Sequence, residues 1–141
     1  MSPDDGLAAM VAKANRSVLA TIKRDGRPQL SNVLHYYDSE TRIARISTRD
    51  PLAKTHNLRR DPRASLHVSS RDFWSWAVAE GTAELTPVAT EIHDATVAEL
   101  IDYYRAISGE HPNWDDYRRA MVRDQRLVVR LHVERFYGEV R

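Results

Sequence analysis

The chain has 141 residues, no cysteine and a formal net charge of +1. This length favours one domain spanning residues 1–141, large enough to bury roughly two-thirds of the surface of the unfolded chain. The absence of cysteine excludes disulfides, thiolate nucleophiles and zinc–cysteine sites, and the balanced charge argues against bulk attraction to nucleic acid or to a membrane.

The N-terminal segment is predicted to form a short amphipathic helix that packs on a sheet. An apolar stripe at helical spacing follows two aspartates and comprises Leu7, Met10, Val11 and Ala14. Residues 1–15 contain no long apolar core, so they resemble neither a signal peptide nor a membrane anchor. Together with the absence of cysteine, this predicts a cytoplasmic protein without a membrane partner.

Three strands are predicted next. Segments 17–23 and 29–37 flank an Asp-Gly turn at 25–26, which is a strong hairpin signal. A second turn at 38–41 leads into an isoleucine-rich strand at 42–47. We therefore expect these three strands to form an antiparallel meander.

A short helix with clustered basic residues is predicted after the third strand. Asp50 is the expected N-cap, and Pro51 is the expected first helical residue. Lys54 and Asn57 are three residues apart, so they share one face of this helix. The segment is either a phosphate clamp or a solvated basic helix between two strands. Ser47 and Thr48 add hydroxyl groups at the exit of the preceding strand.

Two further strands are predicted at 63–69 and 73–85, with a bulge at Gly81. A helix follows Pro87, carries an apolar stripe that begins at Ile92, and ends at Gly109.

Asn113 is expected to cap another helix that runs through Met121. A final half-buried strand has Leu127, Val129, Leu131 and Val133 alternating with other residues. Six short antiparallel strands with peripheral helices indicate a mainly β fold, namely a closed or split barrel, because closure removes exposed sheet edges.

The sequence lacks the common signatures of nucleotide, metal and hydrolase sites. There is no G-x-G-x-x-G, no G-x-x-x-x-G-K-[ST] and no G-x-S-x-G motif. The histidines are scattered and form no H-E-x-x-H pair, so no metal site is predicted.

Two groups of residues have both a structural and a functional interpretation. In the aromatic run 73–76, Trp74 and Trp76 are expected on one side of a strand, as a core or dimer contact or as a wall for a planar ring. Ser31 and Asn32 are either ordinary edge residues or donors aimed at ring carbonyls and hydroxyls.

Four segments in order resemble one known family. They are A-T-I-K-x-D-G-R-P-Q-L-S-N at 20–32, A-K-T-x-N-L-R-R-D-P-R-A at 53–64, A-E-G-T-A at 79–83 and G-E-H-P-N-W-D-D-Y-R at 109–118. Together they resemble the flavin/deazaflavin oxidoreductases, which are pyridoxamine 5'-phosphate oxidase-like split barrels, and within them the B branch that uses coenzyme F420.

The resemblance implies a six-stranded antiparallel split β-barrel of the FMN-binding type that forms a homodimer, with the cofactor in a groove between the subunits. It places Lys54 on the cofactor phosphate. It further implies that Ser47, Thr48 and Asn57 surround the phosphate and linker, that Ser31 and Asn32 meet the ring edge, and that Trp74 forms the groove wall. Relatives often carry a second basic residue where this chain has Leu52, and Arg49 and Arg60 are the candidates to replace it.

The implied activity is hydride transfer from reduced coenzyme F420 to an unsaturated, electron-poor small molecule. The cofactor supplies this chemistry, so no catalytic acid or base is assigned to the chain. The alternatives are an FMN-dependent oxidase or reductase on the same barrel and a non-catalytic F420 carrier or sensor. A single-stranded nucleic-acid module, with Trp74 and Trp76 as stacking platforms, is disfavoured by the near-neutral charge.

Overall fold

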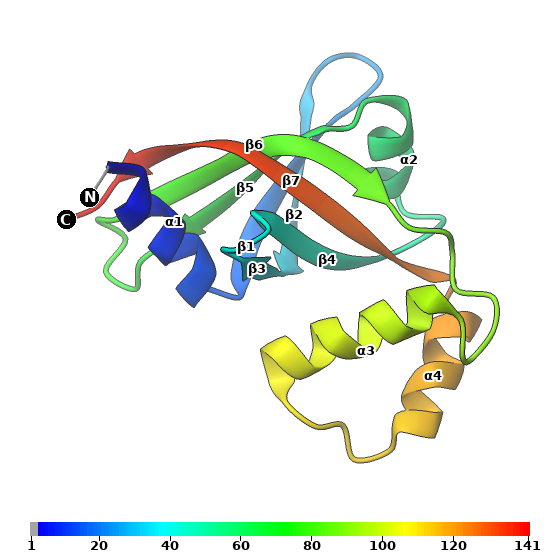
Figure 1. Cartoon of the computed structure of the whole chain (residues 1–141). Helices are drawn as coiled ribbons and strands as arrows, with labels where there is room; N and C mark the ends of the chain where they lie inside the picture. The colour runs from blue at the N-terminus through cyan, green and yellow to red at the C-terminus, as the bar shows by residue number, and fades with distance from the viewer. Residues whose placement is uncertain (1–2) are drawn as a thin grey trace.

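The computed structural model describes residues 3–141, which form one antiparallel sheet of seven strands with four helices around it (Figure 1). The strand order in the sheet is β2-β1-β5-β6-β7-β4-β3. In chain order the elements are α1 (Pro3–Lys13), β1 (Arg16–Ile22), β2 (Pro28–Leu34), β3 (Tyr36–Asp38), β4 (Ile43–Arg49), α2 (Ala53–Arg60), β5 (Arg63–Ser69), β6 (Trp76–Leu85), α3 (Ala95–Ser108), α4 (Trp114–Arg123) and β7 (Arg126–Glu139). The prediction of a mainly β antiparallel fold with peripheral helices is confirmed.

The prediction of six strands is wrong, because the segment 29–37 breaks in two at His35. The side chain of His35 is fully buried. Its Nδ1 lies 2.7 Å from Ser17 Oγ, and its Nε2 lies 2.8 Å from the carbonyl oxygen of Val11. These bonds hold a corner between β2 and β3, which lie at opposite edges of the sheet. The chain therefore passes directly from one sheet edge to the other and curls the sheet into a half-barrel (Figure 1).

Both hairpins of the expected three-stranded meander form, at the turns 25–26 and 38–41, but they do not share a central strand. β2 pairs with β1, whereas β4 pairs with β3 and β7. The turn at 25–26 correctly predicted the β1–β2 hairpin, but the corner at His35 carries the chain away from β2 before β4 begins. Tyr103 of α3 bridges the opening between β2 and β4, because its hydroxyl donates to the carbonyl oxygen of Leu34 at 2.8 Å.

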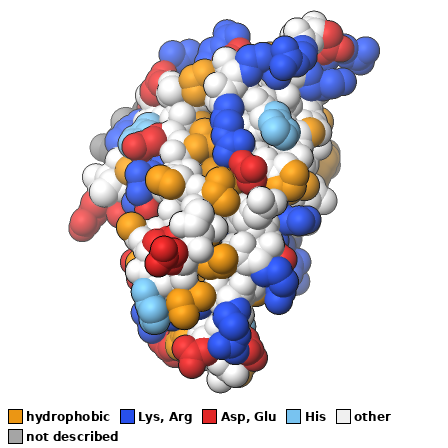
Figure 2. Space-filling view, turned by 90° about the vertical axis from the view of Figure 1, so that its right-hand side faces the viewer, with side chains coloured by type: hydrophobic (Ala, Val, Ile, Leu, Met, Phe, Trp, Pro, Cys, Tyr) orange, Lys and Arg blue, Asp and Glu red, His pale blue; other side chains and the backbone are white. Residues whose placement is uncertain are grey.

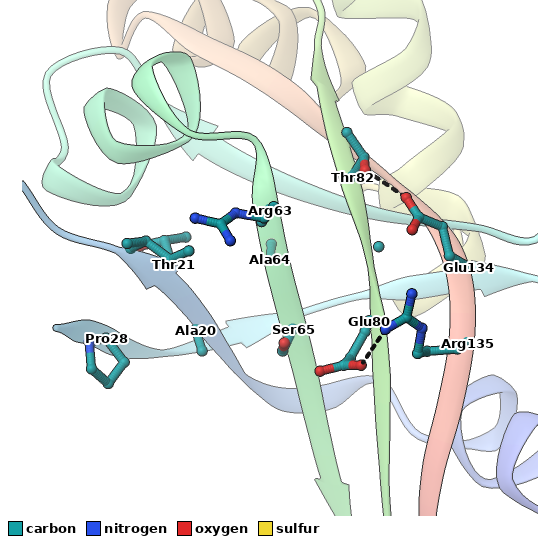
Figure 3. A pocket seen from close by; sticks show the side chains of 12 residues that line it. Ala20, Thr21, Pro28, Arg63, Ala64, Ser65, Glu80, Thr82, Glu134 and Arg135 are labelled. Carbon is teal, nitrogen blue, oxygen red and sulfur yellow. Dashed lines mark hydrogen bonds and ion pairs between the residues drawn. The ribbon is translucent and has the colours of Figure 1, made fainter. Parts of the chain in front are cut away.

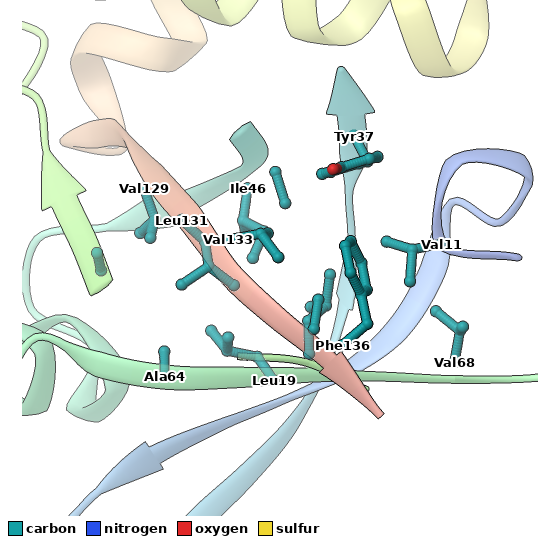
Figure 4. Packing of buried hydrophobic residues seen from close by; sticks show 14 of the residues in the cluster. Val11, Leu19, Tyr37, Ile46, Ala64, Val68, Val129, Leu131, Val133 and Phe136 are labelled. Atoms are coloured by element: carbon teal, nitrogen blue, oxygen red, sulfur yellow. The ribbon is translucent and has the colours of Figure 1, made fainter. Parts of the chain in front are cut away.

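The main core fills the concave face of the half-barrel (Figure 4). Alternate residues of the strands point into it, among them Leu19, Ile46, Leu66, Val129 and Leu131, all fully buried. Helix α1 covers one end of this core. Burying such side chains is worth about 1.5–3 kcal/mol each, which makes this cluster the main source of stability.

The bulge expected at Gly81 is confirmed by a shift in the β6–β7 register between Glu80 and Gly81. A Cβ atom at position 81 would lie 1.9 Å from the carbonyl oxygen of His132, so only glycine allows this approach of the two strands.

Helices α3 and α4 form a hairpin against the convex face of β4 and β7 (Figure 1). A second cluster is buried there and includes Val97, Leu100, Tyr117 and Val128. Asn113 caps α4 as predicted, since its side chain accepts from the amide of Asp116 at 3.1 Å. Helix α3 begins at Ala95 with Asp94 as its cap, so Ile92 lies before the helix and is exposed.

Candidate functional site

Helix α2 begins differently from its sequence prediction. Its N-cap is Leu52, which makes no side-chain capping bond, so Asp50 and Pro51 are not the cap and first helical residue. The Asp50 carboxylate instead forms an ion pair with Arg59 at 2.6 Å. Because it is turned toward the last turn of α2, Asp50 does not occupy the first-turn amides.

Two cations lie together near the start of α2. Burial lowers the pKa of Lys54, and the charge of Arg126 at the start of β7 lowers it further. The NH1 group of Arg126 donates to Ser47 Oγ at 3.4 Å, and its Nε is buried without a hydrogen-bond partner in the described part of the chain. The sequence predicted Lys54 and Ser47 as members of one site. Arg126, which was not predicted, lies near both of them.

Ser47 and Thr48 face opposite sides of β4, because successive strand residues alternate. Thr48 is on the core side, fully buried, with its Oγ1 3.1 Å from Thr55 Oγ1. The side chain of Thr55 also donates to the carbonyl oxygen of Arg49 at 2.7 Å. The side chain of Thr48 therefore fixes α2 to β4 and does not lie beside that of Ser47.

Asn57 is buried, and its amide group bonds to other parts of the protein. Its Nδ2 donates to Thr21 Oγ1 at 3.1 Å and to Gln29 Oε1 at 2.7 Å, and its Oδ1 accepts from Arg60 at 3.1 Å. These contacts join α2 to the β1–β2 hairpin. Lys54 and Asn57 are three residues apart, but their side chains have different surroundings: Asn57 is bonded within the fold, whereas Lys54 lies near the charge of Arg126.

Ser31 and Asn32 likewise face opposite sides of β2. Ser31 lies opposite the core residue Leu19, and its Oγ is buried without a hydrogen-bond partner within residues 3–141. Asn32 lies opposite Val18 on the other face and borders a hollow of about 480 Å³. Of these two predicted ring contacts, only Asn32 lines an open surface depression.

The run 73–76 is mostly a turn, so Trp74 and Trp76 do not share the face of one strand as predicted. β6 starts at Trp76, while Phe73 has a φ of 76° and Trp74 is 64% exposed. The Asp72 carboxylate stabilises this turn by accepting from the amide of Trp74 at 3.0 Å. Local side-chain bonding of this kind overrides the strand propensity of the aromatic residues.

Trp74 and Trp76 border a second hollow, of about 450 Å³, that adjoins the hollow at Asn32. Both hollows are lined by His67 and Ser69 of β5. The two depressions form one groove on the convex face, which we call the Asn32–Trp74 groove. It is lined by a polar edge at Asn32 and by aromatic rings at Trp74 and Trp76.

Tyr103 connects this groove to the cations. Its hydroxyl bonds to the carbonyl oxygen of Leu34, which lines the groove. Burial raises the pKa of Tyr103, and a backbone hydrogen bond with Ser47 and the charge of Arg126 oppose this shift. Tyr103 was not predicted as a site residue, because its partner Leu34 lies 69 positions away in the sequence.

Another hollow, of about 430 Å³, lies over β1, β5 and β6 (Figure 3). Its two cations are paired: Arg135 with Glu80 at 3.8 Å, and Arg63 with Asp61 outside the hollow at 2.7 Å. Arg63 lowers the pKa of Asp61 to about 2. This hollow therefore lacks the unpaired cations found beside α2.

Figure 2 shows Lys and Arg side chains gathered toward the end of the molecule where Figure 1 places α2 and the β1–β2 hairpin. Among residues 3–141, no group of three or more His, Asp or Glu side chains is arranged to hold a metal ion. None of the helices in this range is long and apolar enough to cross a membrane.

The fold is a half-barrel that carries a cationic site beside the start of α2 and an aromatic-walled groove on its convex face. The family model described as pyridoxamine 5'-phosphate oxidase matches residues 3–139. The chain belongs to this family of flavin-type oxidoreductases.

Several solved structures share the fold at low sequence identity. A conserved hypothetical protein from Mycobacterium tuberculosis is 23% identical with a TM-score of 0.74, over 98% of this chain and 84% of the other. An F420 reductase is 18% identical with a TM-score of 0.71, over 94% and 96% of the two chains. A putative pyridoxamine 5'-phosphate oxidase from Listeria innocua is 17% identical with a TM-score of 0.67, over 97% and 98%.

Proposed function

We propose that this protein is a reductase that uses reduced coenzyme F420 to transfer a hydride to an unsaturated, electron-poor small molecule. The observation that carries the proposal is the unpaired state of Lys54. This ammonium is partly buried, yet within residues 3–141 it forms no ion pair with a carboxylate. A cation kept in this state is suited to an anionic ligand group such as a phosphodiester.

The residues present fit such a cofactor. Lys54 and Ser47 would hold its phosphodiester, and Asn32 would donate to or accept from the ring edge. Trp74 and Trp76 would line the groove and exclude water from the reacting atoms. When bound, the reduced deazaflavin supplies two electrons and one proton as a hydride, and solvent supplies the second proton to the product.

Homodimerisation is part of this proposal. Large apolar side chains are exposed in the groove and at the adjoining chain terminus, among them Leu34 at 47%, Phe73 at 77%, Trp74 at 64% and Val140 at 52%. Such a set on a small protein favours an interface with a second copy. A dimer would also enclose the shallow groove, and light scattering that gives a concentration-independent 16.2 kDa monomer would contradict it.

An FMN-dependent oxidase or reductase is the second candidate, because the family model is that of an oxidase and FMN also carries a phosphate. Parallel titrations with oxidised F420 and FMN decide between them. We expect tighter binding of F420, and colourless protein after expression in a host without that coenzyme. Tighter binding of FMN would replace the first proposal with the second.

Catalysis and storage are separated by a second measurement. We expect the protein loaded with reduced F420 to reduce at least one member of a panel of enones, quinones and tetrapyrroles. Binding of F420 without any reduction would favour the non-catalytic carrier.

A further inference from the structure

The cation beside Lys54 lies outside the family motifs. Arg126 is the first residue of β7, and its register partner in β4 is Arg49. Its NH1 group reaches Ser47 Oγ at 3.4 Å, while its buried Nε has no acceptor in the described part of the chain. A buried guanidinium donor without an acceptor costs free energy, so the native fold retains it at a disadvantage unless something else binds there.

No carboxylate compensates for the two cations. Ion pairs within residues 3–141 neutralise other arginines, such as Arg130 through Glu99, but none includes Lys54 or Arg126. Two like charges in a partly dehydrated site repel each other more strongly than in water. An anion between them would relieve this repulsion and satisfy the free donor.

The arginines that the sequence offered in place of Leu52 are engaged elsewhere. Arg49 Nε donates to the carbonyl oxygen of Asp124 at 3.2 Å. Arg60 donates to the carbonyl oxygen of Ile22 at 2.7 Å and to Asn57 Oδ1 at 3.1 Å.

We propose that Arg126 is the second phosphate-binding cation of this protein and acts with Lys54 and Ser47 Oγ on the cofactor phosphodiester. This inference rests on the function proposed above. In this proposal Arg126 of β7 takes the part of the basic residue that the family resemblance implies at the position of Leu52. The planar guanidinium presents paired N–H donors, which match two phosphate oxygens better than a lysine ammonium does.

The test uses phosphate alone as well as the cofactors. The lysines of the full chain are labelled by reductive methylation with ¹³C, and the Lys54 signal is assigned with Lys54→Arg. Inorganic phosphate, oxidised F420 and FMN are then titrated into the parent, Arg126→Gln, Arg126→Lys and the control Arg123→Gln. Arg123 is exposed on α4 and pairs with Asp124, so it matches Arg126 in charge and neighbourhood but not in contact with Ser47.

We expect phosphate to shift the Lys54 signal in the parent and in Arg123→Gln with equal affinity. Arg126→Gln should weaken phosphate and F420 binding about 10- to 150-fold, the range of one lost charge-assisted hydrogen bond. The affinity of Arg126→Lys should lie between those of the parent and Arg126→Gln. The pKa of Lys54 should rise in Arg126→Gln, since a neighbouring like charge is removed. A purely structural role would lower the melting temperature without these changes.

Several outcomes overturn the inference: equal phosphate affinity in Arg126→Gln and the parent, no response of Lys54 to phosphate, or unfolding of both Arg126 variants. The proposed function fails separately. If phosphate binding depends on Arg126 but neither F420 nor FMN binds, the anion site stands and the cofactor assignment does not. If F420 binding requires Lys54 but not Arg126, the cofactor assignment stands and this inference does not.

Discussion

The two sides of helix α2 use similar polar residues in opposite ways. On its buried side, Asn57 bonds through both atoms of its amide and joins α2 to the β1–β2 hairpin, and Thr55 bonds to Thr48 of β4. On the side toward β7, Lys54 has no ion-pair partner among residues 3–141, and Arg126 retains a buried free donor. The difference separates residues that hold the helix in place from residues available to a ligand, although all of them come from one short stretch and its neighbours.

The largest expected effect is on the bonded side. Asn57→Ala should lower the free energy of unfolding by about 2–4 kcal/mol, because it removes the donor to Gln29 and Thr21 inside a buried contact. Chemical denaturation of the apo-protein measures this loss. If Asn57→Ala leaves stability unchanged and only weakens cofactor binding, then Asn57 is a ligand contact, and the two sides of α2 do not differ in role.

Lys54→Ala should weaken cofactor binding without lowering the stability of the apo-protein. Alanine is a good helix former, so the melting temperature of the apo-protein should hardly change. F420 binding should weaken roughly 10- to 150-fold, because one charge-assisted contact is lost, while turnover at saturating cofactor is largely kept. Titration by fluorescence and steady-state kinetics measure the two quantities.

Arg63→Ala is the control for Lys54→Ala, because Arg63 pairs with Asp61 away from the site. Its affinity for F420 should equal that of the parent. Unaltered F420 binding by Lys54→Ala, or its unfolding, would show that the unpaired side of α2 is structural as well.

The sequence predicted the elements whose signals are local. The bounds of β5, the bulge at Gly81 and the cap at Asn113 were all predicted, since each depends on residues within a few positions. The corner at His35 was missed, because a histidine within an apolar run is no break signal and its partners Ser17 and Val11 are 18 and 24 residues away.

The candidate site was predicted in part for the same reason. Lys54 and Ser47 lie close together in the sequence, and Lys54 lies within the recognisable motif at 53–64. Arg126 is 79 residues from Ser47, and the two meet only because β4 pairs with β7 instead of β2. Alternation along strands also separated the pairs Ser31–Asn32 and Ser47–Thr48, which adjacency in the sequence had grouped.

The His35 corner predicts a dependence of stability on pH. Burial lowers the pKa of His35 from its ordinary value of 6.5. The carbonyl of Val11 can only accept, so the neutral ring carries its proton on Nε2 and accepts at Nδ1 from Ser17. Below about pH 6.5 the unfolded chain binds a proton that the folded chain resists. The contribution of this group is therefore complete above that pH and is lost progressively as the pH falls toward the lowered value.

We expect His35→Gln to be less stable than the parent at about pH 7.5 but to lose less stability on acidification to about pH 5.5. Thermal unfolding at several pH values measures this, with the exposed His56→Gln as control. If the parent and His35→Gln respond equally to acid, then other groups dominate this range. Neither side of α2 should contribute to the difference, because His35 bonds to Ser17 and Val11, which lie outside α2.

The smallest expected effect concerns the exposed rim of the unpaired side, where the acidic tail of F420 would lie. Arg59 is 41% exposed at its side chain and is already paired with Asp50. Exposed ion pairs are worth about 0.2–1 kcal/mol, so Arg59→Gln should weaken binding of tailed F420 by less than about fivefold. Asp50→Asn should strengthen it by a similar factor, because it frees the Arg59 guanidinium and removes a negative charge. Both changes should vanish for a deazaflavin without the glutamate tail and shrink at about 1 M salt, where the Debye length is about 3 Å. Equal effects on the tailed and tail-free compounds would place Arg59 at the phosphate and remove the distinction between rim and clamp.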